Sequence, residues 1–327
     1  MRTGIDGLLI LDKPEGMTSL AVVKEVKRRF HVKKAGHIGT LDPFATGVLP
    51  IVINEGTKLV PFLRDEPKEY EAVLKLGEET ATDDFTGEVF HRKEWEGITP
   101  GMIQAVFQTF LGKIQQIPPM FSAIKVQGKP LYRLARRGLE VDRKEREVEI
   151  FDIQVQESDL PRVRFKISCS KGTYVRALGR DIGRKLGCGA HLLRLRRVRS
   201  GSFTIERAIP WGSLRDLSEA QDLSPWLISL GEALASLPEV IGDERLIRMV
   251  RHGKGMAVRD LSPHTLPAFE KGDWLKMSSP EDGLVAILKS EVRDTDIQLA
   301  SPEMLALRAL RVFRPNKMIR KSQLLLG

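Results

Sequence analysis

The sequence predicts an α+β fold in which a mixed, mainly antiparallel sheet with flanking helices is followed by a small C-terminal β domain. Residues 68–76 and 162–170 alternate apolar and polar side chains, as half-buried strands do. Residues 99–111 instead carry apolar side chains at helical spacing. After residue 237 the apolar runs are short and bounded by turns, which indicates a separate domain of strands.

The composition is that of a basic globular protein. The chain has 327 residues, of which 42% are hydrophobic and 29% charged, and this length is enough for a large core and two domains. Its formal net charge of +9 predicts an anionic partner. The charge alone does not separate nucleic acid from a membrane surface or an acidic protein.

Cysteine content and apolar run length exclude several classes of protein. Cys169 and Cys188 form no CxxC pair, so we expect buried free thiols and neither a disulfide framework nor a zinc site. The apolar run near the N-terminus is too short for a signal peptide, and no run reaches membrane-spanning length. We therefore expect a cytoplasmic protein with no membrane partner.

The first predicted elements are a buried strand over residues 7–11, a turn over 12–16 and a helix capped by Thr18 or Ser19. The apolar residues of this helix recur at helical spacing: Val23, Val26 and Phe30. Its other face is basic, which indicates either a solvated surface or one that meets phosphates.

Residues 36–50, GHIGTLDPFATGVLP, form a loop rich in glycine and proline. Glycine permits backbone angles that other residues avoid, and Pro43 pushes Asp42 toward an extended conformation. We therefore expect His37 and Asp42 to be displayed on a shaped loop, where reactive groups often lie. In the alternative interpretation, Asp42 is the N-cap of a helix that begins at Pro43.

A strand over residues 48–53 and a short helix over 57–63 follow this loop. In the next strand, residues 68–76, alternation places Tyr70 on the side of the apolar residues, where a tyrosine is most often part of the core. Residues 77–97 are acidic and predict a loop. The helix over residues 99–111 has these residues spaced for one face: Met102, Val106 and Phe110.

Residues 115–146 combine basic and aromatic side chains. A hairpin-like segment leads into a short helix that carries Tyr132 with Arg133, Arg136 and Arg137. This mixture favours RNA, which proteins hold through phosphate contacts and stacked bases. A charged, solvent-exposed excursion is the alternative.

The strand over residues 162–170 is followed by a turn and by a helix that begins near Thr173. Arg176, Arg180 and Arg184 recur every four residues on this helix, and such a stripe is normally a surface feature. Residues 191–201, HLLRLRRVRSG, predict an edge or groove-lining strand whose apolar members are Leu192, Leu193 and Leu195.

Five segments taken together, in this order and spacing, resemble the bacterial TruB family of tRNA pseudouridine-55 synthases. They are LDKPEGMTS, GHIGTLDPFATGVLP, KEYEAVLKLG, PPMFSAIKVQGKPLYRLAR and CSKGTYVRALGRDIGRKLGCGAHLLRLRR. The match covers the first two-thirds of the chain. Ile38 stands where a threonine is usual, and Phe44 stands where a leucine is common.

The resemblance implies an enzyme that converts uridine 55 in the T loop of tRNA to pseudouridine without metal or cofactor. It implies that Asp42 is the catalytic nucleophile, Arg176 its ion-pair partner, and Tyr70 the ring stacked on the target uracil. It further assigns substrate binding to three residues: His37, Tyr174 and Leu195. The implied partner is the T stem-loop of tRNA, and we expect a monomer.

The implied chemistry suits these residue types. A uridine inside a folded loop must be extruded before it can react, at a cost of a few kcal/mol. A carboxylate can then act covalently or assist departure of the base. A single carboxylate also disfavours ordinary glycoside hydrolysis, which generally uses two opposed acids.

The sequence also divides the chain. Residues 1–237 are expected to form the catalytic domain, with an RNA-binding excursion at about 115–146. The short strand-like runs of residues 238–314 resemble a small β-barrel domain of the PUA type, and a basic tail follows over 315–327. A non-catalytic RNA-binding protein or tRNA chaperone on the same scaffold is the alternative. An RNA methyltransferase is disfavoured, because no glycine-rich nucleotide loop follows a strand.

Overall fold

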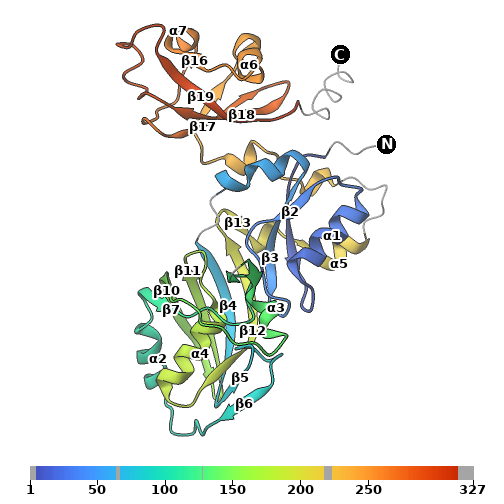
Figure 1. Cartoon of the computed structure of the whole chain (residues 1–327), viewed down its shortest axis with the longest axis vertical. Coiled ribbons are helices and arrows are strands. Elements are labelled where there is room, and N and C mark those ends of the chain that lie inside the picture. The colour runs from blue at the N-terminus through green and yellow to red at the C-terminus, as the bar shows by residue number, and fades with distance from the viewer. Residues whose placement is uncertain (1–4, 64–66, 127, 217–222, 316–327) are drawn as a thin grey trace.

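A computed structural model of the chain describes residues 5–63, 67–126, 128–216 and 223–315. A large mixed sheet with flanking helices occupies most of its length, and a smaller domain, orange to red in Figure 1, holds the C-terminal strands. Of the predicted basic tail, residues 316–327 lie outside the described residues.

The main sheet has the strand order β14-β1-β3-β12-β4-β11-β10-β7, with β13 paired to β12 and β2 to β3. Among the strand pairs of this sheet within the described residues, only β1–β14 and β12–β3 are parallel, so the predicted mixed, mainly antiparallel sheet is confirmed. Its strands are β1 (Gly7–Lys13), β2 (Ala35–His37), β3 (Thr46–Ile53), β4 (Lys68–Leu76), β7 (Gly112–Gln116), β10 (Arg146–Asp159), β11 (Arg162–Cys169), β12 (Ala190–Ser200), β13 (Phe203–Thr204) and β14 (Ile209–Pro210).

Helices and short hairpins surround this sheet. The helices are α1 (Ser19–Arg29), η1 (Asn54–Phe62, a 3₁₀ helix), α2 (Pro100–Gln108), α3 (Leu131–Ala135), α4 (Val175–Leu186), η2 (Ile205–Arg207), α5 (Trp211–Asp216), η3 (Ser224–Trp226) and η4 (Glu232–Leu234). The hairpins pair β5 (Glu78–Thr80) with β6 (Val89–Arg92) and β8 (Lys125–Val126) with β9 (Lys129–Pro130). Thr18 caps α1, as one of the two predicted caps.

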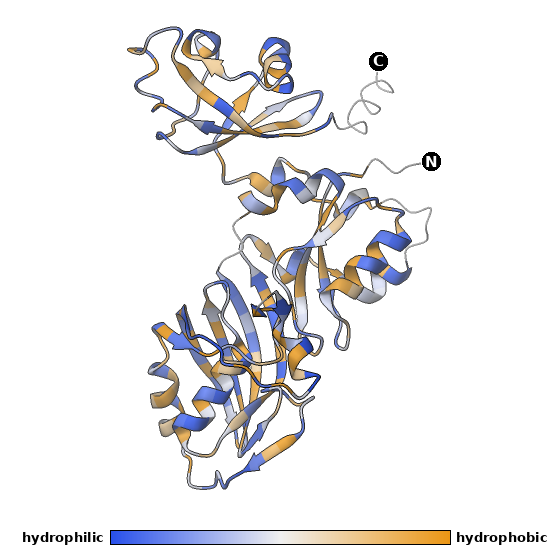
Figure 2. Ribbon diagram, in the orientation of Figure 1, coloured by the Kyte–Doolittle hydropathy of each residue, from blue (hydrophilic) through white to orange (hydrophobic). Residues whose placement is uncertain are grey.

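The C-terminal domain is a curled half-barrel of five strands in the order β15-β17-β18-β19-β16, compatible with the predicted PUA-like domain. Its elements are β15 (Glu239–Ile241), α6 (Glu244–Arg251), β16 (Met256–Ala257), α7 (Val258–Leu261), β17 (Trp274–Ser279), β18 (Gly283–Ser290) and β19 (Leu305–Val312). Figure 2 shows hydrophobic residues, in orange, along the strands of both sheets. None of the helices in the described ranges combines the length and hydrophobicity that a membrane span requires.

Strand β12, predicted at an edge or along a groove, lies inside the main sheet. It pairs antiparallel with β4 along its whole length and parallel with β3 at Arg196 and Arg197. The approach of β3 depends on Gly47, because a Cβ there would lie 2.1 Å from the backbone oxygen of Arg197. The edge prediction was wrong because the arginine content suggested solvent contact, whereas Arg197 is fully buried.

Two further expectations about local structure were wrong. Residues 77–97 are not only a loop, since they contain the β5–β6 hairpin. In α2 the fully buried residues are Ile103 and Phe107. Of the predicted face, Val106 and Phe110 are partly buried against the core, whereas Met102 is exposed. The helix is therefore rotated by about one position from the predicted face, because its contacts with the sheet decide its orientation.

Candidate active site

The loop that carries Asp42 connects β2 to β3 and is fastened to α1. The Leu41 amide donates to Ser19 Oγ (2.9 Å), and Ser19 Oγ donates to the Leu41 carbonyl (3.0 Å). Gly39 turns the chain at φ +68°, in the left-handed region that glycine adopts without strain. No helix follows Asp42, since the chain enters β3 instead. The helix-cap alternative was therefore wrong.

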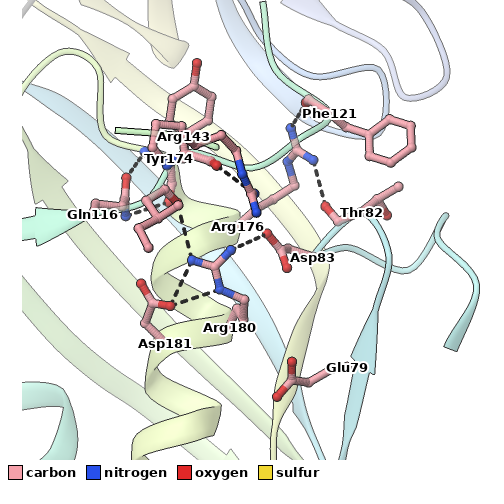
Figure 3. A network of polar contacts seen from close by, with 12 residues as sticks. Glu79, Thr82, Asp83, Gln116, Phe121, Arg143, Tyr174, Arg176, Arg180 and Asp181 are labelled. Atoms are coloured by element: carbon pink, nitrogen blue, oxygen red, sulfur yellow. Dashed lines mark hydrogen bonds and ion pairs between the residues drawn. The ribbon is translucent and has the colours of Figure 1, made fainter. Parts of the chain in front are cut away.

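Arg176 joins Asp42 to two other segments. Its Nε donates to Asp42 Oδ2 at 2.8 Å. Its two outer nitrogens donate to the Thr82 carbonyl (2.7 Å) and the Phe121 carbonyl (2.8 Å), as Figure 3 shows. Only 3% of the Arg176 side chain is exposed, against 29% of Asp42. A buried guanidinium thus aims a carboxylate that stays accessible to a substrate, through one hydrogen bond.

Asp84 supplies a second carboxylate to Arg176, at 3.5 Å from Nη1. The other oxygen of Asp84 accepts three hydrogen bonds, one from the Thr82 hydroxyl and two from the amide and hydroxyl of Thr86. Asp84 is therefore fixed in place, so that Arg176 lies between a fixed acid and the accessible one.

The position of Arg176 follows from the start of α4. Tyr174 is the N-cap residue, and its side chain makes no capping bond. Instead, the Gln116 side-chain amide binds both backbone groups of Tyr174, accepting from its N–H (2.8 Å) and donating to its carbonyl (3.1 Å). Gln116 is buried at the end of β7, where residues 115–146 leave the sheet. Sequence reasoning did not assign it a role.

Tyr70 lies on β4 with 7% of its surface exposed. Burial raises the pKa of its hydroxyl to about 12, while Arg197 opposes this shift and the nearby charge of Asp42 adds to it. The phenol is therefore neutral at physiological pH, and the side chain lies within electrostatic reach of Asp42. Alternation along β4 predicted the buried side correctly.

Two buried cations that sequence reasoning missed hold the Asp42 loop. Arg197 is fully buried and donates to the carbonyls of Val48 (2.8 Å) and Gly39 (2.9 Å). Its phase along β12, two residues after the buried Leu195, was a signal in the sequence that an arginine points inward.

Lys13 is the second of these cations. Its Nζ is fully buried and donates to the carbonyls of Pro14 (2.8 Å), Met17 (2.6 Å) and Pro43 (3.1 Å). Burial lowers the pKa of this amine to about 8, although Asp42 opposes the shift. The contact with Pro43 ties the loop to the end of β1.

The three predicted substrate-binding residues border the same region. His37 ends β2 half-buried, with a buried Nδ1 that has no hydrogen-bond partner among the described residues; burial and then Arg197 lower its pKa. Burial raises the pKa of Tyr174, and the charge of Asp42 adds to that shift. Leu195 is 5% exposed on β12, opposite Ala72 of β4.

Ile38 and Phe44 are both buried beside the loop. Ile38 is 5% exposed and packs in an apolar cluster that continues into the C-terminal domain. Phe44 is equally buried and meets the edge of Phe85, with ring centroids 6.0 Å apart. Both residues therefore support the loop from the protein side.

The two cysteines are free and buried, as expected. Within the described ranges, no group of three histidine, cysteine or acidic side chains is arranged to hold a metal ion.

Comparisons with known proteins show which sequences the chain is similar to. A model of the N-terminal domain of TruB family pseudouridylate synthases matches residues 27–175, and a model of the C-terminal domain of tRNA pseudouridylate synthase B matches residues 176–235. The tRNA pseudouridine synthase B of Geobacter sulfurreducens is 45% identical over 309 residues, 94% of this chain and 100% of that protein. That of Syntrophus aciditrophicus is 41% identical over 309 residues, 94% and 99% of the two chains.

Solved structures show the same fold. A chain in the crystal structure of a Cbf5-Nop10-Gar1 complex matches with a TM-score of 0.70 and 30% identity, covering 96% of this chain and 86% of that chain. A chain in the structure of an H/ACA RNP bound to a substrate RNA containing 2'-deoxyuridine matches with a TM-score of 0.69 and 28% identity, covering 95% and 86%.

Proposed function

The chain belongs to the TruB family of tRNA pseudouridine synthases, and from this premise we propose that Asp42 catalyses the conversion of uridine 55 in the T loop of tRNA. The family makes the protein an enzyme with an RNA substrate. The position of the target uridine and the role of each side chain are our proposal.

The convergence of Asp42, Arg176 and Tyr70 carries this proposal. These residues come from a loop, a helix and a strand. Arg176 binds Asp42 directly, and Tyr70 lies opposite Arg197 of β12, which donates to the Gly39 carbonyl of the Asp42 loop. A non-catalytic RNA-binding protein on this scaffold would need a basic surface but not an accessible carboxylate held on a buried arginine.

In the proposed mechanism, the target uridine leaves the RNA stack and enters the space between the Asp42 loop and β4. Tyr70 stacks against the uracil, His37 holds the opened RNA, and Tyr174 and Leu195 line the base pocket. Asp42 then assists cleavage of the bond between N1 of uracil and C1′ of ribose. The base turns and C5 bonds to C1′. The C5 proton is then lost to solvent and N1 takes up a proton, so the uridine is isomerised without a co-reactant.

We further propose the division of labour that the sequence predicts. Residues 1–237 carry the chemistry, the excursion at about 115–146 holds the T stem-loop, and residues 238–314 add RNA contacts as a PUA-like domain. We expect a cytoplasmic monomer, since the T stem-loop is the only partner that this site requires.

Replacing Asp42 tests the function. Asp42→Ala should abolish release of tritium from tRNA labelled at C5 of uridine, while tRNA affinity stays within about tenfold, or 1.4 kcal/mol. Asp12→Ala is the matched control, because Asp12 is similarly exposed (27%) and pairs with Arg196 at 2.7 Å. A tRNA with cytidine at position 55 should release no tritium.

Two results would contradict the proposal. Turnover by a folded Asp42→Ala protein would exclude Asp42 as the catalyst. Wild-type protein that binds tRNA but forms no pseudouridine would favour the non-catalytic alternative.

A further inference from the structure

Three arginines on α4 face three carboxylates of the segment that runs from β5 toward β6. Arg176 meets Asp84 (3.5 Å), Arg180 meets Asp83 (3.1 Å) and Arg184 meets Glu79 (2.7 Å). The arginines lie one helical turn apart, so these pairs form three successive rungs along the helix. The expectation of a surface stripe was wrong for the first two, which are 3% and 8% exposed.

The first two rungs also reach the base of the excursion, where it leaves β7. The Phe121 carbonyl accepts from Arg176 (2.8 Å), as drawn in Figure 3. The Ile117 carbonyl accepts from Arg180 (3.3 Å). Arg184 donates to Glu79 alone among the described residues. The rungs therefore share one chemistry but differ in whether they touch the excursion.

The excursion needs these donors because of its own sequence. Pro118 and Pro119 have no N–H group, and both are buried in the stretch between β7 and β8. This stretch therefore has fewer backbone N–H groups that could donate to its own carbonyls, and side chains supply donors instead. A third guanidinium, that of Arg143, donates to the Pro118 carbonyl (3.0 Å).

Burial separates the second rung from the third. The side chains of Arg180 and Asp83 are 9% and 12% exposed, whereas that of Arg184 is 55% exposed. Arg180 also binds a second carboxylate, Asp181, at 2.9 Å. Charge pairs weaken with solvent exposure, so the second rung should hold its geometry far better than the third.

We propose that Arg180 is a positioning residue for the catalytic pair. With Asp83 and Asp181 it fixes the start of the excursion at Ile117, four residues before the Phe121 carbonyl that binds Arg176. Arg176 is thereby kept at the angle that presents its Nε to Asp42. This inference rests on the proposed function, since it names what aligns the same site.

Arg180 and Arg184 give a matched pair of variants. Arg180→Met should lower the single-turnover rate at saturating tRNA at least tenfold, while the Kd for tRNA changes less than threefold. Arg184→Met should leave the rate within twofold of wild type. Arg180→Lys keeps the charge but loses the planar guanidinium. Its single-turnover rate should lie between those of wild type and Arg180→Met.

A double variant separates positioning from general loss of structure. If Arg180 acts through Arg176, adding Arg180→Met to Arg176→Lys should lower the rate by much less than it does in wild type. If the rate loss of the double variant equals the product of the two single losses, the two arginines act independently and the proposal is overturned. Equal losses in Arg180→Met and Arg184→Met would overturn it as well.

If Arg180→Met does not fold, Asp83→Asn is the alternative test. It removes the carboxylate charge that faces Arg180 but leaves the contact of Arg180 with the Ile117 carbonyl in place. It should lower the rate at unchanged Kd, and an unchanged rate would overturn the proposal. Inactive wild-type protein would instead contradict the proposed function itself.

Discussion

The buried cations around Asp42 differ in how their charges are compensated and in whether they can lose a proton. Arg176 and Arg197 are nearly or fully buried, and both donate to backbone carbonyls. These dipoles compensate the charge of Arg197, while Arg176 is compensated by Asp42 and Asp84 as well. Lys13 likewise donates to three carbonyls, but as an amine it can lose its proton. Among these cations it is therefore the one that titrates in an accessible range.

We expect an alkaline limit on activity from Lys13. Its pKa in the folded protein is about 8, below the ordinary value of 10.5, so the fold disfavours the protonated amine. This lowers the free energy of unfolding below pH 8, and the loss is relieved as pH rises from 8 toward 10.5. The catalytic rate, unlike the folding stability, should fall as pH rises. Above pH 8 the neutral amine has two N–H groups for three carbonyls, and its positive charge near Asp42 is lost.

The single-turnover rate should therefore fall as pH rises through about 8, measured from pH 6.5 to 9.5 at saturating tRNA. Binding of tRNA over the same range is the control. A rate that stays constant to the upper end would show that the charge of Lys13 does not support the site.

The arginines of α3 and β12 differ in whether they are available to bind phosphates. On and just after α3, Arg133, Arg136 and Arg137 are exposed. On β12, by contrast, Arg196 pairs with Asp12 and Arg197 is buried, so these two arginines do not form a free basic surface. The helix is exposed at the end of a hairpin, while the strand lies inside the sheet.

The salt dependence of tRNA binding should distinguish these elements. Arg133→Met should reduce the slope of log Kd against log salt by roughly 0.7 to 0.9, because one phosphate contact is lost. Arg196→Met should leave the slope unchanged, because its charge is already paired with Asp12. Equal slopes for Arg133→Met and wild type would show that α3 meets no phosphate.

At the scale of the whole molecule, the C-terminal domain packs against the main sheet and η1. Leu284, Ile287 and Phe313 share an apolar cluster with residues of β1, including Leu8 and Ile10. Around this cluster, the Phe62 ring meets Trp274 with centroids 5.0 Å apart, and Lys58 Nζ donates to the Val312 carbonyl (2.9 Å). A domain buried in this way should unfold together with the rest of the chain.

Phe313→Ala tests this coupling. Phe313 is 2% exposed and lies under Lys58 Nζ, 5.6 Å from the ring centroid, so its truncation should cost about 3–5 kcal/mol of unfolding free energy. Leu299→Ala, at a residue 91% exposed, should cost almost nothing. In urea we expect one transition that shifts as a whole. Two transitions, with the larger unchanged by Phe313→Ala, would show that the domains unfold independently.

By itself the sequence determined the strands β4 and β11, the start of α4 and the loop of Asp42. Alternation, helical spacing and proline act over a few residues, so such features can be predicted without the rest of the chain. The same local signals carried the family resemblance, and with it Asp42 and Arg176.

Only the tertiary structure decided which face of an element is buried where the residues of that element are compatible with either face. The arginines of α4 and β12 have the pattern of a surface, but carboxylates and carbonyls from distant segments surround Arg180 and Arg197 and allow their burial. Likewise, Lys13 and Gln116 become part of the site through contacts with residues 30 and 58 positions away. Such compensation depends on partners that local sequence does not contain.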